Sequence, residues 1–434
     1  MAFWKRIKAS LVKWLPLKKD KHENLEFEQE ESEKNSPEHI SKQVKDQAKD
    51  TPLSNPTLLL TQEDEPLPYK IISRYEDSKY WGWVERIRGK QELLKPEKFI
   101  LQVEQKDEEI IRFFESAQPP SYDVLLHCLP ASKPSKENPI LLVHGAGHNA
   151  NQAWCQSFNE EDGLLQTLSS AGKEVYAVTF AHPHGDNWMQ AVQLSNVIKR
   201  IKEQTNKQKI TVIAHSKGGI PAWIYLSDLT NSFGAPYEGE VETYIMLGTP
   251  NKGLDFPFRH VSPNWSVLEM DISAPIACDS LLHYGIYINT TNYTLYKDGG
   301  AFPGSAQLLY RWDDKYPVQQ QAKTIYDGGQ NIILHSRGID AAIREGGCLI
   351  EKLLSSPIHK TISVHVLAGN NPYINGFAIE NDVENDGLLF VDSVLYTEGI
   401  APFANQVKRK DVLPLNHLEL LYEDDAHQWI LDGL

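Results

Sequence analysis

The sequence has few cysteines, no long hydrophobic run and a shortage of positive charge. Its 434 residues include four cysteines, widely spaced and without a Cys-x-x-Cys pair, which argues against a structural zinc site and requires no disulfide. No stretch approaches the roughly 18 consecutive apolar residues of a transmembrane helix. With 43 Lys and Arg against 58 Asp and Glu, the net charge is −15. Because nucleic-acid partners require basic surfaces, we expect none.

The most informative segment is Lys209–Gly219, K-I-T-V-I-A-H-S-K-G-G. An apolar strand ends at Ser216, and helical spacing follows over Ile220–Leu229. A serine in such a strand-to-helix turn is typical of a nucleophile elbow, whose strain requires small residues on both sides, here Ala214 and Gly218. The helix directs its first N–H groups toward any anion formed there. The alternative is that the serine only caps an ordinary helix.

Candidate partners for this serine follow later in the chain. A serine hydroxyl is a poor nucleophile until a base takes its proton. Asp386 follows a predicted strand, where an acid can orient a histidine, and His417 precedes the last helical run. Asp382 is the second candidate for the acid. Alternatively, Asp386 turns the chain at Asp-Gly, and His417 is an ordinary residue at a helix start.

Stabilisation of an oxyanion requires a second loop near the serine. The apolar strand Pro139–Val143 is followed by His144-Gly145-Ala146-Gly147. We expect the N–H groups of Ala146 and Lys217 to flank the developing oxyanion. The Lys217 side chain is expected to be solvated or ion-paired rather than catalytic.

The histidines outside this constellation do not predict a cofactor or metal. His182, His184 and Asp186 follow a predicted strand and include ligand types that suit a metal. No fourth ligand is evident, so a polar loop lining a pocket is the preferred interpretation. We interpret His148 and His215 as local structural residues.

Several motifs together resemble a known family. They are similar to the bacterial lipase and esterase branch of the α/β-hydrolases, including the Ala-x-Ser-x-Gly elbow of Bacillus-type lipases. The resemblance spans about residues 120–434 and implies Ser216 as nucleophile, Asp386 as acid and His417 as base. The motifs are Leu142-Val143-His144-Gly145, Ala214-His215-Ser216-Lys217-Gly218-Gly219, Leu247-Gly248-Thr249-Pro250, Asn385-Asp386-Gly387-Leu388 and Asn416-His417-Leu418.

The pattern of residues 67–434 predicts one α/β-hydrolase domain. Strands alternate with helices, which favours a mostly parallel sheet with helices on both faces and a site at the carboxyl ends of the strands. Residues 68–120 are predicted to form mixed helices leading into an edge strand at Tyr122–Leu129. The predicted core strands are Ile140–His144, Val175–Phe180, Ile210–His215, Val241–Leu247 and Thr361–Ala368, and the predicted helices are Gln152–Ser170, Trp188–Glu203 and Ile220–Leu229.

Residues 251–359 are predicted to be a cap or lid inserted between two core strands. Their aromatic residues fit an acyl pocket and a small core of the cap equally well. These aromatic residues are Trp265, Tyr284, Tyr287, Tyr293, Tyr296 and Phe302.

The first nineteen residues differ in charge from the rest. They contain six Lys or Arg and no acid, with Trp4 and Trp14 on one helical face. This pattern predicts a basic amphipathic helix on a membrane surface, or alternatively a partner-docking segment. Residues 20–66 are polar and proline-rich, as expected of a disordered linker. Since residues 1–19 lack a continuous apolar signal-peptide core, we expect a cytoplasmic protein, peripheral on the inner membrane surface.

These patterns predict a serine ester hydrolase, a lipase or esterase acting through an acyl-enzyme on lipid-like esters. Two alternatives remain. One is a lipid acyltransferase with the same triad. The other is a non-catalytic scaffold of this fold that binds lipid or protein.

Overall fold

The computed structural model places most of the chain after residue 66. It describes residues 67–132, 136–155, 163–260, 265, 268, 273–297, 300–374, 377–378 and 383–434. The predicted helix at 1–19, the predicted linker at 20–66 and the second candidate acid Asp382 lie outside the described residues. Within these residues, no helix is long and apolar enough to cross a membrane.

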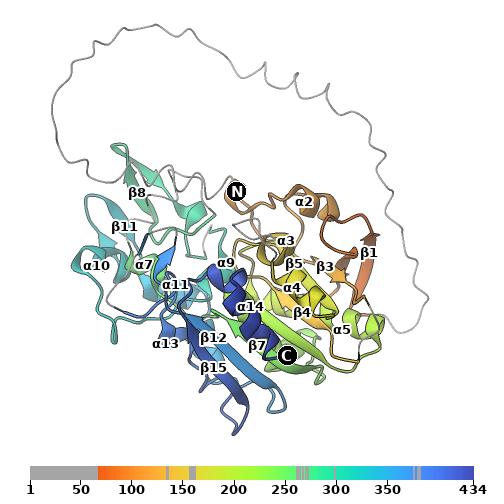
Figure 1. Cartoon of the computed structure of the whole chain (residues 1–434). Helices are drawn as coiled ribbons and strands as arrows, with labels where there is room; N and C mark the ends of the chain where they lie inside the picture. The colour runs from red at the N-terminus through yellow and green to blue at the C-terminus, as the bar shows by residue number, and fades with distance from the viewer. Residues whose placement is uncertain are drawn as a thin grey trace, which may run out of the picture.

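The centre of the fold is a nine-stranded sheet with the order β1-β2-β3-β5-β4-β6-β7-β12-β15 (Figure 1). The first three strands pair antiparallel, and β3 pairs antiparallel with β5. All pairs from β5 to β15 are parallel. The strands are β1 (Tyr69–Tyr75), β2 (Trp83–Gly89), β3 (Asp123–Leu129), β4 (Ile140–Val143), β5 (Val175–Phe180), β6 (Ile210–His215), β7 (Val241–Leu247), β12 (Ser363–Gly369) and β15 (Val407–Leu413).

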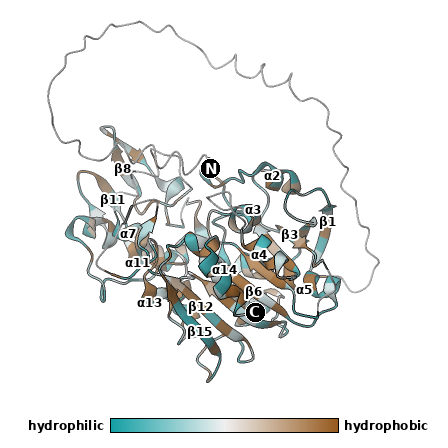
Figure 2. Cartoon of the chain, in the orientation of Figure 1, coloured by the Kyte–Doolittle hydropathy of each residue, from teal (hydrophilic) through white to brown (hydrophobic). Residues whose placement is uncertain are grey.

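Helices cover both faces of the sheet because successive side chains of each strand point to opposite faces. In β6, Val212 and Ala214 pack in one cluster of buried residues and Ile213 in the other. The first cluster includes α5 and α6, and the second includes α3, α4 and α14. Figure 2 shows that the central strands are largely hydrophobic, as expected for a sheet buried on both faces. These helices are α3 (Ala150–Trp154), α4 (Leu164–Ser170), α5 (Asn187–Thr205), α6 (Gly219–Leu226) and α14 (Asp424–Leu431).

The strand register brings the loops of the predicted site to one edge of the sheet. Val143 at the end of β4 is level with Ala214 in β6, and His215 is level with Leu247 at the end of β7. Leu247 is in turn level with Leu367 in β12. The loops that follow these strands therefore emerge side by side.

The prediction for residues 68–129 was partly wrong. The segment contains the strands β1 and β2 before the short helices η3 (Leu101–Val103) and α2 (Glu108–Phe114). As a result β3 lies inside the sheet, between β2 and β5, and is not an edge strand. The burial pattern explains the error, because Trp83–Ile87 is buried without a break and lacks the alternation typical of a strand.

The segment between β7 and β12 forms a smaller sheet of its own, the insertion, which lies to one side of the main sheet in Figure 1. Its strands have the antiparallel order β10-β11-β8-β9. Its elements include α7 (Phe256–Arg259), β8 (Ser280–His283), β9 (Ile286–Asn289), α9 (Pro303–Ala306), α10 (Lys323–Tyr326), β10 (Gly329–Gln330), β11 (Leu334–Ser336), α11 (Ile339–Glu345) and α12 (Leu349–Leu353).

Three of the six aromatic residues named in the insertion pack in or against its own core. Tyr296 is buried in the insertion's cluster, and Trp265 and Tyr293 pack against that cluster. Phe302 packs with Val103 in a separate small cluster. The remaining two, Tyr284 and Tyr287, are exposed to solvent.

Candidate active site

Ser216 occupies a strained turn directly after β6. Its φ of 53° is in the left-handed region, which L-residues rarely adopt without a structural or functional cause. Small neighbours make the turn possible. A Cβ on Gly145 would lie 2.9 Å from Ser216 Cβ, and a Cβ on Gly218 would clash with the carbonyl oxygens of Val143 and His144.

The structure brings Ser216, His417 and Asp386 together in one hydrogen-bonded row. His417 Nε2 lies 2.8 Å from Ser216 Oγ. On the other side of the ring, His417 Nδ1 donates to Asp386 Oδ2 at 2.7 Å. A carboxylate can only accept, so the Nδ1 proton leaves Nε2 free to receive a proton from the serine hydroxyl.

Backbone groups hold the acid and the histidine in this geometry. Asp386 is fully buried, and its Oδ1 accepts hydrogen bonds from the N–H groups of Leu388 at 3.0 Å and Leu389 at 2.7 Å. His215 Nε2 donates to the carbonyl oxygen of His417 at 2.9 Å. These contacts leave Oδ2 of the acid for the imidazole and anchor the loop that carries it.

The loop after β4 lies against the serine, as predicted. His144 donates from Nδ1 to Gly145 O at 2.8 Å and accepts at Nε2 from Phe180 N–H at 3.2 Å, which defines one neutral tautomer. Burial lowers the pKa of His144 to about 3, so the ring remains neutral near pH 7. The loop therefore lies close to Ser216 through Gly145, and the first N–H groups of the elbow helix have no acceptor within that helix.

The expectation that the Lys217 side chain is solvated or ion-paired was wrong. This side chain is only 2% exposed, and Nζ donates to Gln190 Oε1. Burial lowers its pKa to about 7, partly offset by Glu97 and Asp186. Gly304 of the insertion packs so closely that an added Cβ would lie 2.8 Å from Nζ.

Two residues around this lysine were not anticipated from the sequence. Glu97 is buried and accepts from Ser121 Oγ and from Asp186 N–H, each at 2.7 Å. Burial raises its pKa to about 7. The other is Gln190, on α5. Both lie far from the motifs in the sequence, and no local pattern marks them as partners of Lys217.

The histidines of the 182–186 loop are engaged by the protein. His182 Nε2 donates to Lys98 O at 3.0 Å, and its Nδ1 accepts from His184 N–H at 3.1 Å. His184 bonds Ser305 and Ser273 through its two ring nitrogens. Asp186 caps α5. In the described part of the chain, no three His, Cys, Asp or Glu side chains are grouped to hold a metal.

His148 lies in the loop after β4, near His417. Burial, with a contribution from the nearby His417, lowers its pKa to about 4. Its buried Nδ1 has no hydrogen-bond partner among the described residues. The interpretation of His148 as a locally bonded structural histidine therefore gains no support from the hydrogen bonds of this ring.

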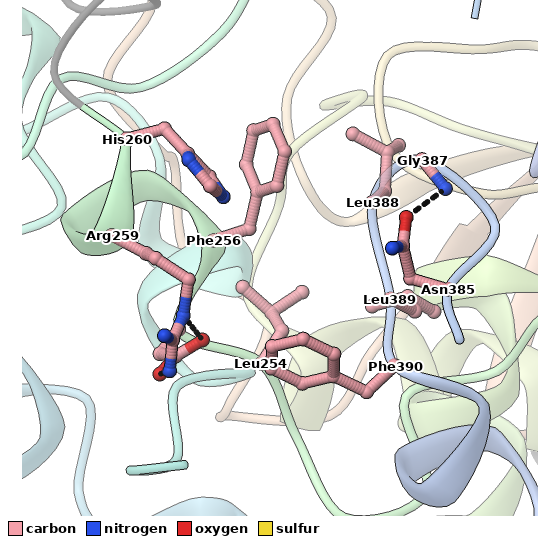
Figure 3. A pocket seen from close by; sticks show the side chains of 10 residues that line it. Leu254, Phe256, Arg259, His260, Asn385, Gly387, Leu388, Leu389 and Phe390 are labelled. Carbon is pink, nitrogen blue, oxygen red and sulfur yellow. Dashed lines mark hydrogen bonds and ion pairs between the residues drawn. The ribbon is translucent and has the colours of Figure 1, made fainter. Parts of the chain in front are cut away.

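An open pocket lies between α7 and the loop that carries Asp386. Figure 3 shows Phe256 and Leu254 on one side and Leu388 and Phe390 on the other. The lining is mostly apolar, with Arg259 and His260 at its edge. The full lining is Leu254, Asp255, Phe256, Arg259, His260, Asn385, Gly387, Leu388, Leu389 and Phe390.

Comparisons with known proteins found a matching family model and similar solved structures. The family model described as Lipase (class 2) matches residues 137–294, which include β4, the elbow and the first part of the insertion. The chain is also similar to the mature form of the Bacillus licheniformis lipase BlEst2, with 16% identity, a TM-score of 0.43, and coverage of 70% of this chain and 95% of that chain.

Two further solved structures are similar to the chain. One is a highly thermostable carboxyl esterase from Bacillus coagulans, with 12% identity, a TM-score of 0.38, and coverage of 72% of this chain and 92% of that chain. The other is a monoacylglycerol lipase from Paleococcus ferrophilus, with 14% identity, a TM-score of 0.34, and coverage of 68% of this chain and 95% of that chain. The predicted family resemblance and fold class are confirmed. Through residues 137–294 the chain matches the class 2 lipases, and the protein is an ester hydrolase of the lipase and esterase type with the α/β-hydrolase fold.

Proposed function

We propose that the protein hydrolyses lipid-like carboxylic esters through an acyl-enzyme on Ser216. The single observation that carries this proposal is the continuous row from Ser216 Oγ through His417 to Asp386, with distances of 2.8 and 2.7 Å. In this geometry the base is already within proton-transfer distance of the nucleophile.

In the first half of the reaction, Ser216 Oγ attacks the ester carbonyl carbon while its proton passes to His417 Nε2. Asp386 stabilises the protonated imidazole. The carbonyl oxygen becomes an oxyanion, which accepts from the N–H groups of Ala146 and Lys217. His417 then protonates the alcohol oxygen, the C–O bond breaks, and the acyl group stays on Ser216.

In the second half, a water molecule loses a proton to His417 Nε2 and attacks the acyl carbon. The second tetrahedral intermediate collapses, and the proton returns to Ser216 Oγ as the acid leaves. An acyltransferase would pass the acyl group to another alcohol instead. Product analysis with and without added alcohol separates the two activities.

The test of the catalytic role is the Ser216→Ala variant. We expect it to retain the fold and to lose hydrolysis of p-nitrophenyl esters by several orders of magnitude. A fluorophosphonate probe should label the wild type and not the variant. Ser227→Ala, in the turn that ends α6, is the matched control and should retain both activity and labelling. Wild-type rates in Ser216→Ala would reject the mechanism.

The basic N-terminal segment supports a further part of the proposal, that residues 1–19 bind an anionic membrane surface. Each lysine near such a surface contributes about 1 kcal/mol of attraction. Full-length protein should therefore sediment with anionic vesicles at low salt. Replacing Lys5, Lys8 and Lys13 together by Glu should abolish that binding, and equal sedimentation of the two proteins would contradict the anchor.

A further inference from the structure

One edge of the insertion's sheet exposes a group of large apolar side chains. Tyr284 is 82% exposed, Ile286 69% and Ile332 81%, with Tyr287 and Ile333 also exposed. We call these five residues the hairpin tip. Single exposed apolar residues are common on protein surfaces, whereas a contiguous group indicates an interaction site.

The strand pairing explains why these residues lie together. β8 and β9 form a hairpin whose turn is Tyr284-Gly285. β11 pairs with the other side of β8, and the backbone bond from Leu282 N to Ile333 O measures 2.6 Å. The Tyr287 hydroxyl donates to Ile332 O. The β8–β9 turn therefore lies beside the β10–β11 turn, which contains Ile332 and Ile333. Both turns are close to the β8 label in Figures 1 and 2.

The turn of the hairpin tip places Tyr284 in a backbone conformation that is unfavourable for a residue with a side chain. Tyr284 has φ of 47° and Gly285 φ of 78°, the positive values of a type I′ turn, where Asn-Gly is the preferred pair. The Tyr284 ring packs edge-on against His283, with ring centroids 4.4 Å apart, while 82% of the residue stays exposed. Removing the exposed part of this ring from water would add favourable transfer free energy.

The charge pattern favours a lipid surface over a charged partner as the occupant. Residues 280–296 and 328–336 contain no Asp, Glu, Lys or Arg, although 23% of the chain is charged and its net charge is −15. Because the tip carries no charge, its insertion into a bilayer would not require a charged side chain to lose its hydration. Tyrosine and isoleucine also suit the boundary between headgroups and acyl chains, where an amphipathic ring keeps its hydroxyl in water.

We propose that the hairpin tip inserts into the interfacial layer of a phospholipid bilayer and docks the insertion on it. This inference rests on the proposed function, since an enzyme for lipid-like esters needs access to a lipid surface. The tip is separate from residues 1–19. It acts through apolar burial, whereas the basic segment acts through charge, so salt and lipid composition distinguish the two contacts.

The test compares full-length variants by sedimentation with phosphatidylcholine vesicles at high salt, where electrostatic attraction is screened. The tip variant carries Tyr284→Asn, Ile286→Thr and Ile332→Asn. Asn tolerates the left-handed turn, and all three changes are exposed. The control is Leu101→Asn, which removes an apolar side chain that is 63% exposed in η3. This residue lies outside the β8–β9 and β10–β11 hairpins.

We expect the tip variant to lose vesicle binding by about tenfold or more, because isoleucine side chains that leave lipid for water lose their transfer free energy. Leu101→Asn should bind like the wild type, and both variants should hydrolyse a soluble p-nitrophenyl ester at the wild-type rate. Ser216→Ala should still bind vesicles, so a failure of the catalytic proposal is visible separately.

Equal binding of the tip variant and the wild type would overturn the docking proposal, as would an equal loss in Leu101→Asn. Sedimentation velocity measures whether the protein forms a dimer, which is the third possible outcome. If the wild type forms a dimer that the tip variant cannot form, and neither binds vesicles, the tip is a contact between two copies of the chain and the lipid proposal is wrong.

Discussion

His417 Nε2 and Ser216 Oγ lie 2.8 Å apart although 201 positions separate them in the chain. The distance is set by two separate anchors. The strained elbow after β6 holds the serine, and the bond from His215 to the carbonyl oxygen of His417 ties the two loops together. Each anchor can be changed while the other is left intact.

The Asp386→Asn variant tests whether Asp386 fixes the tautomer of His417. We expect Asp386→Asn to retain the contacts of Oδ1 with the N–H groups of Leu388 and Leu389. The amide NH₂ would replace Oδ2, however, and could no longer accept from His417 Nδ1–H. The wrong tautomer should lower kcat by about 10³–10⁴, with little change in KM or in thermal stability. Steady-state kinetics with a soluble ester measure this, and a proportional rise in KM would contradict it.

Alanine variants of Gly248 and Gly239 distinguish the effect of backbone strain from the effect of displacing His417. Gly248 has φ of +52°, and a Cβ there would lie 3.2 Å from His417 Nδ1, while Gly239 has φ of +82° with nothing within 4 Å. Both alanine variants should lose about 1 kcal/mol of stability through left-handed strain. Only Gly248→Ala should also lower kcat, by about tenfold or more, because the imidazole must shift. Similar kcat values for the two variants would show that Gly248 does not position His417.

Because Lys217 is buried, we expect the stability of the protein to depend on pH. Because the pKa of Lys217 is about 7 in the folded protein and about 10.4 unfolded, the unfolded state binds more protons between these values. Stability from this group therefore rises with pH across that window. Lys217→Met lacks this dependence. Its stability relative to wild type, measured by urea unfolding, should be most favourable near pH 7 and should decline toward pH 10.

A pH-independent difference between Lys217→Met and the wild type would show that the lysine is not the titrating group. Glu97 provides the complementary check. With its pKa raised to about 7, it binds more protons folded than unfolded between about 4.3 and 7, so its contribution to stability falls as pH rises through that range. Glu97→Gln should remove this second slope.

Acid should destabilise the protein through its buried histidines. Burial lowers the pKa of His182 to about 4, below the unfolded value of about 6.5. The unfolded state therefore takes up a proton first as pH falls from 6.5 to 4, which costs on the order of 1 kcal/mol per pH unit for each such histidine. His182→Asn keeps an acceptor for His184 N–H and should show a shallower loss of stability over this range in urea titrations. An identical slope would assign the effect to other groups.

The grouping of Ser216, His417 and Asp386 could be predicted because each member has a local signature. The elbow requires small residues around Ser216, and an acid after a strand and a histidine before a helix are placed by chain order. The neighbours that hold these groups have no such signature. Glu97 and Gln190 lie on different elements from Lys217, and only packing brings them to its side chain. The position of β3 was also missed, because strand order depends on pairing partners that periodicity does not specify.

The sequence alone determined the candidate site residues and the alternation of strands and helices, since backbone strain and hydrophobic periodicity act over a few residues. Tertiary structure decided which buried groups surround that chemistry and which apolar residues stay exposed. Lys217, expected to be solvated or ion-paired, is buried, and Tyr284, expected in an acyl pocket or in the core of the cap, is exposed. Burial depends on contacts between distant segments, so it emerges only when the whole chain is folded.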